Sequence, residues 1–310
     1  MLKKKLSSVG LKTDAELKRI LQIDQATLDK FKTVQKAALA EAKTLNKKKS
    51  GKIRVLGISS SARSASGMAQ EKSNSEQLLE KSLAHCKNLG AETKLISLRD
   101  YDIKPCQACY STANTHCHFS CSCYPKGTPA GDDMSNKLYD EILWAEVIIF
   151  ATPVNNFKIS ALLADFIDRC ISLDGSLQPA DKTNPKNREL NIKQMKFIEQ
   201  TADSNVPGSG LLRRFLGKVA GIIVTGHEAG ASLTISSLFM TLHYYGMIFP
   251  PFSSVYAMSS ICNSTYQDKP LVTGKCYDLE IEMQAKNLMT AAKLSRQVKP
   301  TDWRYNNGAN

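Results

Sequence analysis

The residues best suited to chemistry stand where an apolar run gives way to hydroxyl groups. Residues 53–58 are apolar enough for a buried strand, and Ser59, Ser61 and Arg63 follow them directly. Ser73-Asn-Ser-Glu76 comes next, and its S-x-x-E spacing predicts a capping box that starts a helix. Hydroxyls and the free amides of a helix N-terminus, brought together at the end of a strand, make a site for a phosphate.

The kind of phosphate follows from what is missing after this strand. Neither the pyrophosphate fingerprint G-x-G-x-x-G nor the P-loop pattern G-x-x-x-x-G-K-[ST] is present there. A loop of hydroxyls and backbone donors suits the terminal phosphate of a mononucleotide such as FMN. The alternative interpretation is an ordinary serine-rich turn before a capped helix.

Two further expected strands also end in unusual residues. Ala151-Thr-Pro-Val-Asn-Asn-Phe157 follows an apolar run, and Pro153 forces the chain out of the sheet there. The asparagines can donate to and accept from a flat heterocycle, while Pro153 and Val154 offer it an apolar edge. Thr225-Gly-His-Glu-Ala-Gly230 follows another such run, and its glycines allow the backbone to approach a ligand closely.

A third group of reactive residues is the cysteine-rich segment of residues 106–123. It contains five of the nine cysteines, Cys106, Cys109, Cys117, Cys121 and Cys123, with His116 and His118 beside the third. Soft thiolates at this density could hold an iron–sulfur cluster or zinc. Reduced thiols that pack an irregular loop are the plainer interpretation, and a redox-reactive thiol is a third.

The elements that must position these residues alternate along the chain. We expect strands at residues 53–58, 92–98, 147–152, 219–225 and 247–249. Helices are expected at residues 73–89, 132–144, 159–171, 232–245 and 279–294. Alternating strands and helices predict a parallel sheet, and continuous apolar strands predict burial of both of its faces. In such sheets ligands bind at the carboxyl ends of the strands.

The flanking and interrupting segments complete the expected organisation. Residues 1–50 predict two helices, the second capped by Asp24, and carry +8 of the net charge of +12. We interpret this basic extension as a solvated helix surface, with nucleic-acid binding unlikely and membrane-surface binding a further alternative. Residues 51–298 form the main domain, residues 172–217 interrupt it as a long polar loop, and residues 299–310 form a tail.

These motifs together resemble the flavodoxin-like NAD(P)H-dependent FMN reductase family, which includes quinone reductases and iron–sulfur flavoproteins. The match rests on Gly57-Ile-Ser-Ser-Ser-Ala-Arg63 with Ser73-Asn-Ser75, and on Pro105-Cys106 with Asp132-Asp-Met134. It rests also on Thr152-Pro-Val-Asn155 with Phe166-Ile-Asp-Arg169, and on Thr225-Gly-His-Glu228. These motifs stand in the family's order over residues 52–295, and the resemblance implies a flavodoxin-like sheet of five parallel strands in the order 2-1-3-4-5.

The resemblance also implies site residues and a cofactor. The FMN phosphate would be held by Ser59, Ser61, Arg63, Ser73, Asn74 and Ser75. The ring would be lined by Thr152, Pro153, Val154, Asn155 and Asn156, and its pyrimidine side closed by Thr225, Gly226 and His227. Two departures matter: Asn155 stands where the family often has tyrosine, and residues 64–72 lengthen the phosphate loop.

The implied activity is that of an FMN-dependent NAD(P)H oxidoreductase acting on a quinone, a flavin or another small acceptor. The flavin carries the reactivity, so no catalytic acid or base and no metal ligand are assigned. A homodimer or homotetramer is implied as well. An iron–sulfur electron carrier and a non-enzymatic module with a basic binding arm are the alternatives. No apolar run is long enough to span a membrane, no secretory signal is recognised, and a cytoplasmic location is expected.

Overall fold

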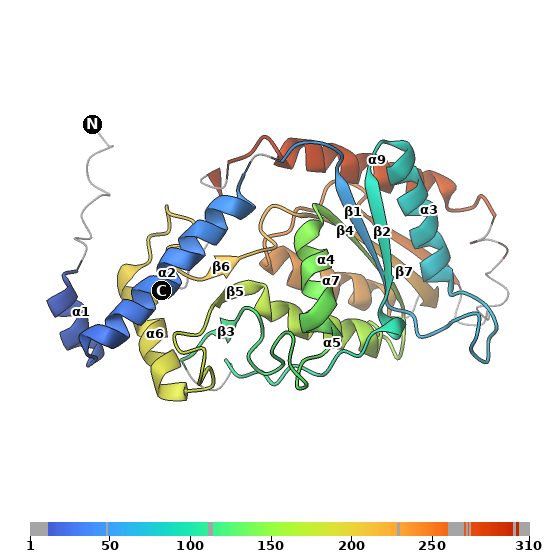
Figure 1. Ribbon diagram of the computed structural model, residues 1–310. Coiled ribbons are helices and arrows are strands. Elements are labelled where there is room, and N and C mark those ends of the chain that lie inside the picture. Colours follow the sequence, from blue (N-terminus) through green and yellow to red (C-terminus); the bar gives the residue numbers. More distant parts are fainter. Residues whose placement is uncertain are drawn as a thin grey trace.

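The structure is a computed structural model that describes residues 12–47, 49–110, 114–227, 230–259, 270, 272, 274–299, 302 and 303. Its centre is a parallel sheet of five strands in the order β2-β1-β4-β7-β8 (Figure 1). The strands are β1 (Arg54–Ser59), β2 (Glu92–Ser97), β4 (Val147–Pro153), β7 (Val219–His227) and β8 (Ser254–Ser259). In chain order this is 2-1-3-4-5, so the predicted flavodoxin-like topology is confirmed.

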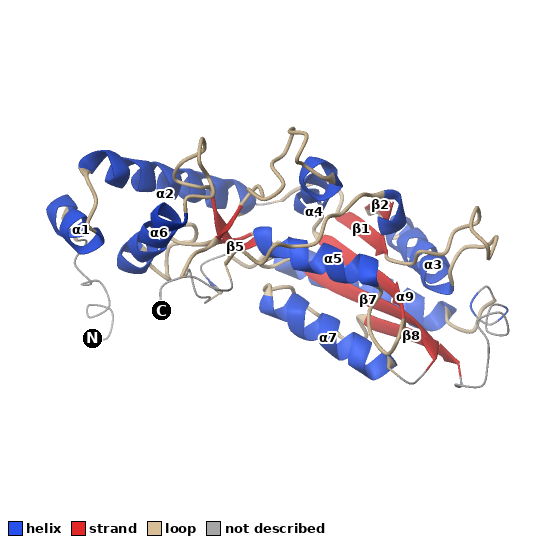
Figure 2. Ribbon diagram, turned by 90° about the horizontal axis from the view of Figure 1, so that it is seen from below, coloured by secondary structure: helices blue, strands red, loops and turns tan. Residues whose placement is uncertain are grey.

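Helices cover both faces of this sheet, as the apolar strands predicted. One face carries α3 (Asn74–Asn88) and α9 (Asp278–Ser295), and the other carries α4 (Tyr139–Trp144), α5 (Ala161–Arg169) and α7 (Ala231–Tyr244) (Figure 2). Successive residues of each strand feed the two cores alternately: Val55 lies with α3 and α9, and Leu56 lies with α4 and α5. Since both faces are buried at the centre of the sheet, β4 is apolar from Val147 to Ala151, whereas the edge strand β2 carries Glu92 and Lys94.

The fifth strand was misplaced by the sequence prediction. Residues 247–249 form only a single bridge, between Ile248 and Val219, and the strand that pairs with β7 is β8. Pro250 and Pro251 follow the predicted segment, and proline lacks the backbone N–H that a ladder needs. Pairing therefore resumes only at Ser254, opposite Ile222.

The interrupting segment 172–217 is also not the long polar loop that we expected. It contains β5 (Asp174–Leu177), α6 (Arg188–Thr201) and β6 (Leu212–Arg213). Together with β3 (Cys117–His118), β5 and β6 form a second, three-stranded sheet. Helix α6 is capped by Asn187 and buries Phe197 and Ile198 on one face. The polar composition of the segment obscured this apolar face.

This segment packs against the N-terminal helices. The two predicted helices are present as α1 (Asp14–Leu21) and α2 (Gln25–Leu45), the second capped by Asp24. Their buried residues form a separate core with α6, in which the rings of Phe31 and Phe197 lie 5.6 Å apart. Figure 2 shows these three helices beside the main sheet rather than over either face.

The predicted helix at residues 132–144 is not a continuous α-helix. It consists of a π-helical segment at Met134–Leu138 followed by α4. The helix predicted at 159–171 is α5 followed by a 3₁₀ turn at Cys170–Ser172. Among the residues that the structure describes, no helix combines the length and the apolar character that a membrane span requires.

Candidate functional site

Three loops meet at the carboxyl edge of the main sheet, because β1, β4 and β7 are parallel neighbours. Ser60 joins the first two: its amide donates to the carbonyl of Ala151 (2.9 Å), and its carbonyl accepts from the Ser160 hydroxyl (2.8 Å). The amide of Val154 donates to the carbonyl of Thr225 (2.8 Å) and joins the second to the third. The three predicted site regions therefore form one continuous edge.

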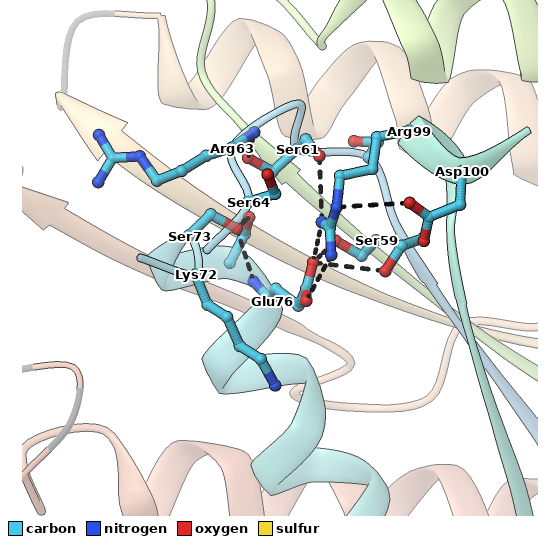
Figure 3. Close-up of polar contacts among 12 residues, drawn as sticks. Ser59, Ser61, Arg63, Ser64, Lys72, Ser73, Glu76, Arg99 and Asp100 are labelled. Carbon is cyan, nitrogen blue, oxygen red and sulfur yellow. Dashed lines mark hydrogen bonds and ion pairs between the residues drawn. The ribbon is translucent and has the colours of Figure 1, made fainter. Parts of the chain in front are cut away.

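The first loop gathers hydroxyl groups around the start of α3 (Figure 3). Ser73 and Ser75 lie with their hydroxyl oxygens 3.2 Å apart, and Ser73 also accepts from the amide of Glu76 (3.2 Å). Ser61 accepts from the amide of Arg63 at 3.2 Å. The three serines are buried, and the first amides of α3 have no partner within the helix. We call this group the hydroxyl loop, and its donors suit an anion.

Only half of the predicted capping box forms, because Glu76 has another partner. Its carboxylate does not reach back to the amide of Ser73; it accepts from the Ser59 hydroxyl (2.9 Å) and from the guanidinium of Arg99 (3.0 Å through Nη2). Arg99 donates in turn to the carbonyl of Ser61 (3.4 Å). An ion pair that the sequence analysis did not find thus lies directly beneath the hydroxyl loop (Figure 3).

The electrostatics of this pair favour the charged state of both groups. Burial would raise the pKa of the Glu76 carboxyl, but the hydrogen bonds from Arg99 and Ser59 hold that pKa below its ordinary value. The bond to Glu76 raises the pKa of Arg99. Because Arg99 neutralises the carboxylate of Glu76, this carboxylate repels an anion in the hydroxyl loop less strongly.

The remaining phosphate candidates lie at the rim of this loop. Arg63 is half-buried and pairs with Glu71 at 2.7 Å. Asn74 is buried at the first position of α3. The guanidinium of Arg63 therefore belongs to the site region, with an acidic partner already beside it.

The second loop presents a mixed surface. Thr152 is buried, and its hydroxyl accepts from the amide of Ser160 (3.3 Å) and donates to the carbonyl of Pro153 (3.0 Å). Pro153 and Val154 are half-buried, whereas Asn155 and Asn156 are exposed. The asparagine side chains are thus open to solvent, as a ring-lining role requires.

The glycines of the third loop are needed for its approach to the second. A Cβ added to Gly226, whose φ is +146°, would stand 3.0 Å from the Cβ of Val154, and one added to Gly230 would stand 2.6 Å from the Cα of Phe157. Thr225 is buried between these loops. His227 ends β7, and its side chain lies outside the part that the structure describes.

The cysteine segment is a separate thiol-rich region. The sulfurs of Cys109 and Cys123 lie 3.8 Å apart. A hydrogen bond from Cys123 and the charge of Arg169 lower the pKa of Cys121 to about 6 despite its burial. Across the described ranges, no three or more His, Cys, Asp or Glu side chains are grouped so that they could hold a metal ion.

A second buried ion pair anchors this segment. Arg169 donates to both carboxylate oxygens of Asp132, and its guanidinium lies 4.4 Å from the ring centre of Tyr124. The same guanidinium donates to the carbonyl of Lys104 (2.9 Å). Asp132 and Arg169 stand in separate motifs of the family resemblance, and the structure shows that they are partners.

The comparisons with known proteins agree with this geometry. Residues 53–260 match the model of the NADPH-dependent FMN reductase family, which is more than half of the chain. The chain therefore belongs to that family, and its class is that of the FMN-dependent oxidoreductases.

Individual relatives resemble the chain over part of its length. An iron–sulfur flavoprotein of Archaeoglobus fulgidus is 32% identical over 120 residues, which cover 38% of this chain and 51% of that protein. The chain thus matches about half the length of this relative. RosB with bound 8-demethyl-8-formylriboflavin-5'-phosphate has a TM-score of 0.57 at 14% identity, covering 80% of this chain and 82% of its own. At that identity the likeness to RosB concerns the fold alone.

The ion pair beneath the hydroxyl loop gives a prediction. Arg99→Met should lower the free energy of unfolding at pH 7 by about 3 kcal/mol, because the buried carboxylate of Glu76 loses its counter-charge. In the wild type the lowered pKa of Glu76 stabilises the fold at pH values above the ordinary pKa of a glutamate. This contribution is lost as the pH falls through the lowered pKa. In the variant burial raises that pKa, so the deficit should shrink from pH 7 to pH 5. Urea unfolding across this range measures both effects.

Lys126→Met is the matched control. Lys126 pairs with Asp140 at the surface, and both side chains are largely exposed. Its loss should cost under about 1 kcal/mol. A deficit in Arg99→Met that stays constant across the pH range would contradict the role assigned to Glu76.

Proposed function

We propose that this protein is an FMN-dependent NAD(P)H oxidoreductase that passes electrons to a small acceptor such as a quinone or a free flavin. The observation that carries the proposal is the hydroxyl loop at the carboxyl edge of a flavodoxin-like sheet, in a chain of the FMN reductase family. The bound riboflavin 5'-phosphate derivative of RosB supports a flavin phosphate as the ligand of such a fold.

The residues present fit the phosphate end of FMN. Ser61, Ser73 and Ser75 supply hydroxyls and the start of α3 supplies amides, while Asn74 and Arg63 stand at the rim. Ser59 donates to Glu76, so we assign it to the support of the loop together with any contact to the phosphate. This donor set lies over a carboxylate that Arg99 neutralises, as a dianionic ligand requires.

The other two loops would receive the isoalloxazine ring. Pro153, Val154, Asn155 and Asn156 line it in this proposal, with Thr152 buried behind them. Thr225, Gly226 and His227 close its pyrimidine side. When bound, FMN would supply the redox chemistry between the nicotinamide and the acceptor. The residues of the chain bind the two partners and hold them in line.

The hydroxyl loop yields a direct test. The double variant Ser61→Ala/Ser75→Ala should bind FMN roughly 100-fold more weakly, because two hydrogen bonds to a charged phosphate are lost at about 1.5 kcal/mol each. Fluorescence titration with FMN measures the affinity, and circular dichroism verifies the fold. Ser66→Ala, an exposed hydroxyl in the same loop, is the control and should leave the affinity unchanged. Unchanged affinity in the double variant would contradict the assignment.

We also propose that the protein is a homodimer or homotetramer. The outer face of α7 supports this, since Leu233, Met240 and Tyr244 expose 65%, 70% and 69% of their surfaces. Neighbouring apolar side chains on one helix in solvent indicate a contact surface. Light scattering of the FMN-loaded protein gives its mass, and a monomer would contradict this proposal.

The organisation and location of the chain are proposals of the same kind. We propose residues 1–50 as a helical extension, residues 51–298 as the FMN-binding domain with 172–217 inserted, and residues 299–310 as a tail. The joint core of α1, α2 and α6 supports treating extension and insertion as one lobe. We propose a cytoplasmic location, which the free thiols of the described cysteines favour.

An iron–sulfur electron carrier is the second candidate. The relative in Archaeoglobus fulgidus favours it, as does the contact between the sulfurs of Cys109 and Cys123.

Iron content separates the two candidates. Protein purified without oxygen should contain flavin and less than 0.1 iron atoms per chain (roughly background) if the first candidate holds. Stoichiometric iron that is lost in Cys109→Ser/Cys123→Ser, with FMN retained, would establish the second candidate instead.

A further inference from the structure

A cavity of about 490 Å³ lies at the amino edge of the main sheet, opposite the candidate flavin site. It forms where the end of α2 approaches the end of α9 (Figure 1). The residues that matter for its chemistry are Lys47, Lys49, Glu146, Arg296, Lys299 and Trp303.

A second cavity of about 240 Å³ adjoins the first and shares Lys47 and Lys49 with it. Four more basic residues line this second cavity: Arg54, Arg213, Arg214 and Lys218. Among the described lining residues of the two cavities, eight are cationic, and Glu146 is the one carboxylate.

The carboxylates nearby are already engaged. Glu146 accepts from Arg296 at 2.7 and 2.8 Å and lies 3.6 Å from Arg54. Arg214 pairs with Glu41 (2.6 Å), and Arg213 pairs with Asp174 (3.0 Å). Among the described residues that line the two cavities, four lysines form no ion pair: Lys47, Lys49, Lys218 and Lys299.

The surroundings of two lysines, one buried and one half-buried, make their positive charge unfavourable. Lys218 is 5% exposed and donates to the carbonyls of Leu143 and Ala145. Its burial, with the charges of Lys49 and Arg54, lowers its pKa to about 7. Partial burial lowers the pKa of Lys49 as well; the charge of Glu146 opposes this shift, and the charges of Arg54 and Arg296 add to it. A bound anion would relieve this repulsion, and the concave wall concentrates the positive field.

We propose that this cavity is a second ligand site, which takes a phosphorylated small molecule bearing at least two negative charges. The volume is that of a small-molecule site rather than of a nucleic-acid groove. Trp303, Leu216 and Val298 line the same cavity and provide apolar surface for the organic part of the ligand.

This ligand is distinct from the nicotinamide donor of the proposed reaction. Glu146 immediately precedes β4, whose seven residues lead to the second loop of the candidate flavin site. At about 3.3 Å per residue, this strand separates the two sites by roughly 20 Å. A molecule held by Lys49 and Lys299 therefore lies far from the flavin ring, and the proposal stands independently of the oxidoreductase function.

Isothermal calorimetry of the FMN-loaded full-length protein with inorganic pyrophosphate tests the proposal. Loading with FMN keeps the probe from the hydroxyl loop. We expect stoichiometric binding that weakens as salt rises, and at least a tenfold weaker affinity in Lys49→Gln/Lys299→Gln. Lys87→Gln, an exposed lysine on α3, should bind as the wild type does. Lys49→Arg/Lys299→Arg should retain binding and verifies that loss in the glutamine variant reflects charge.

Three results would overturn the proposal: no pyrophosphate binding by the wild type, equal binding by the glutamine variant, or equal loss in Ser61→Ala/Ser75→Ala. The last would place the probe at the hydroxyl loop instead. Tight binding of a single-stranded RNA oligonucleotide with none of pyrophosphate would also overturn it and would assign the basic surface to nucleic acid. Retained FMN absorbance in each lysine variant keeps this test separate from that of the proposed function.

Discussion

The ion pair between Glu76 and Arg99 is the interaction on which the candidate site depends. A carboxylate at the start of a helix repels any anion that approaches the same amides, unless its charge is neutralised. Arg99, from the turn that follows β2, supplies that neutralisation, and Ser59, from the end of β1, orients the carboxylate. Three neighbouring elements are thus fixed relative to one another beneath the hydroxyl loop.

A second buried pair plays the corresponding part on the other side of the sheet. Asp132 and Arg169 connect the start of the π-helical segment to the end of α5, and both are almost fully buried. Arg169 also donates to the carbonyl of Lys104, and its guanidinium lies over the ring of Tyr124. Lys104 precedes the cysteine segment and Tyr124 follows it. Desolvation offsets most of the attraction within such a pair, but removal of one partner leaves a buried, uncompensated charge and is costly. Together the two pairs define the positions of both chemically unusual loops.

The sequence predicted the central sheet well because its signals were local. Apolar runs with helices between them gave four strands, and Ser73 and Asp24 were recognised as caps, whereas the strand order came from the family resemblance. The fifth strand was misplaced because residues 247–249 are apolar, and only the two prolines after them stop the pairing. Helix α6 was missed since its buried face is completed by the distant N-terminal helices. Its amphipathic pattern is weak within a polar segment.

The candidate site, too, could be predicted from the sequence only in part. Each loop could be located from its own residues, but the partner of Glu76 stands 23 residues further along the chain and no spacing rule predicts it. The role of Gly226 and Gly230 in the contact between two loops likewise depends on the assembled sheet. The charge of the amino-edge cavity comes from the segments that follow α2 and α9, from the starts of β1 and β7 and from the end of β6. These segments are far apart in the sequence, so the composition showed only a basic N-terminal extension.

An anaerobic titration of the FMN-loaded protein with NADPH and, separately, with NADH shows whether a nicotinamide reduces the bound flavin. The account predicts that one of the two nicotinamides bleaches the visible absorbance of the bound flavin stoichiometrically, and that a quinone added afterwards restores it. Protein that retains no FMN, or bound flavin that neither nicotinamide reduces, would contradict the account.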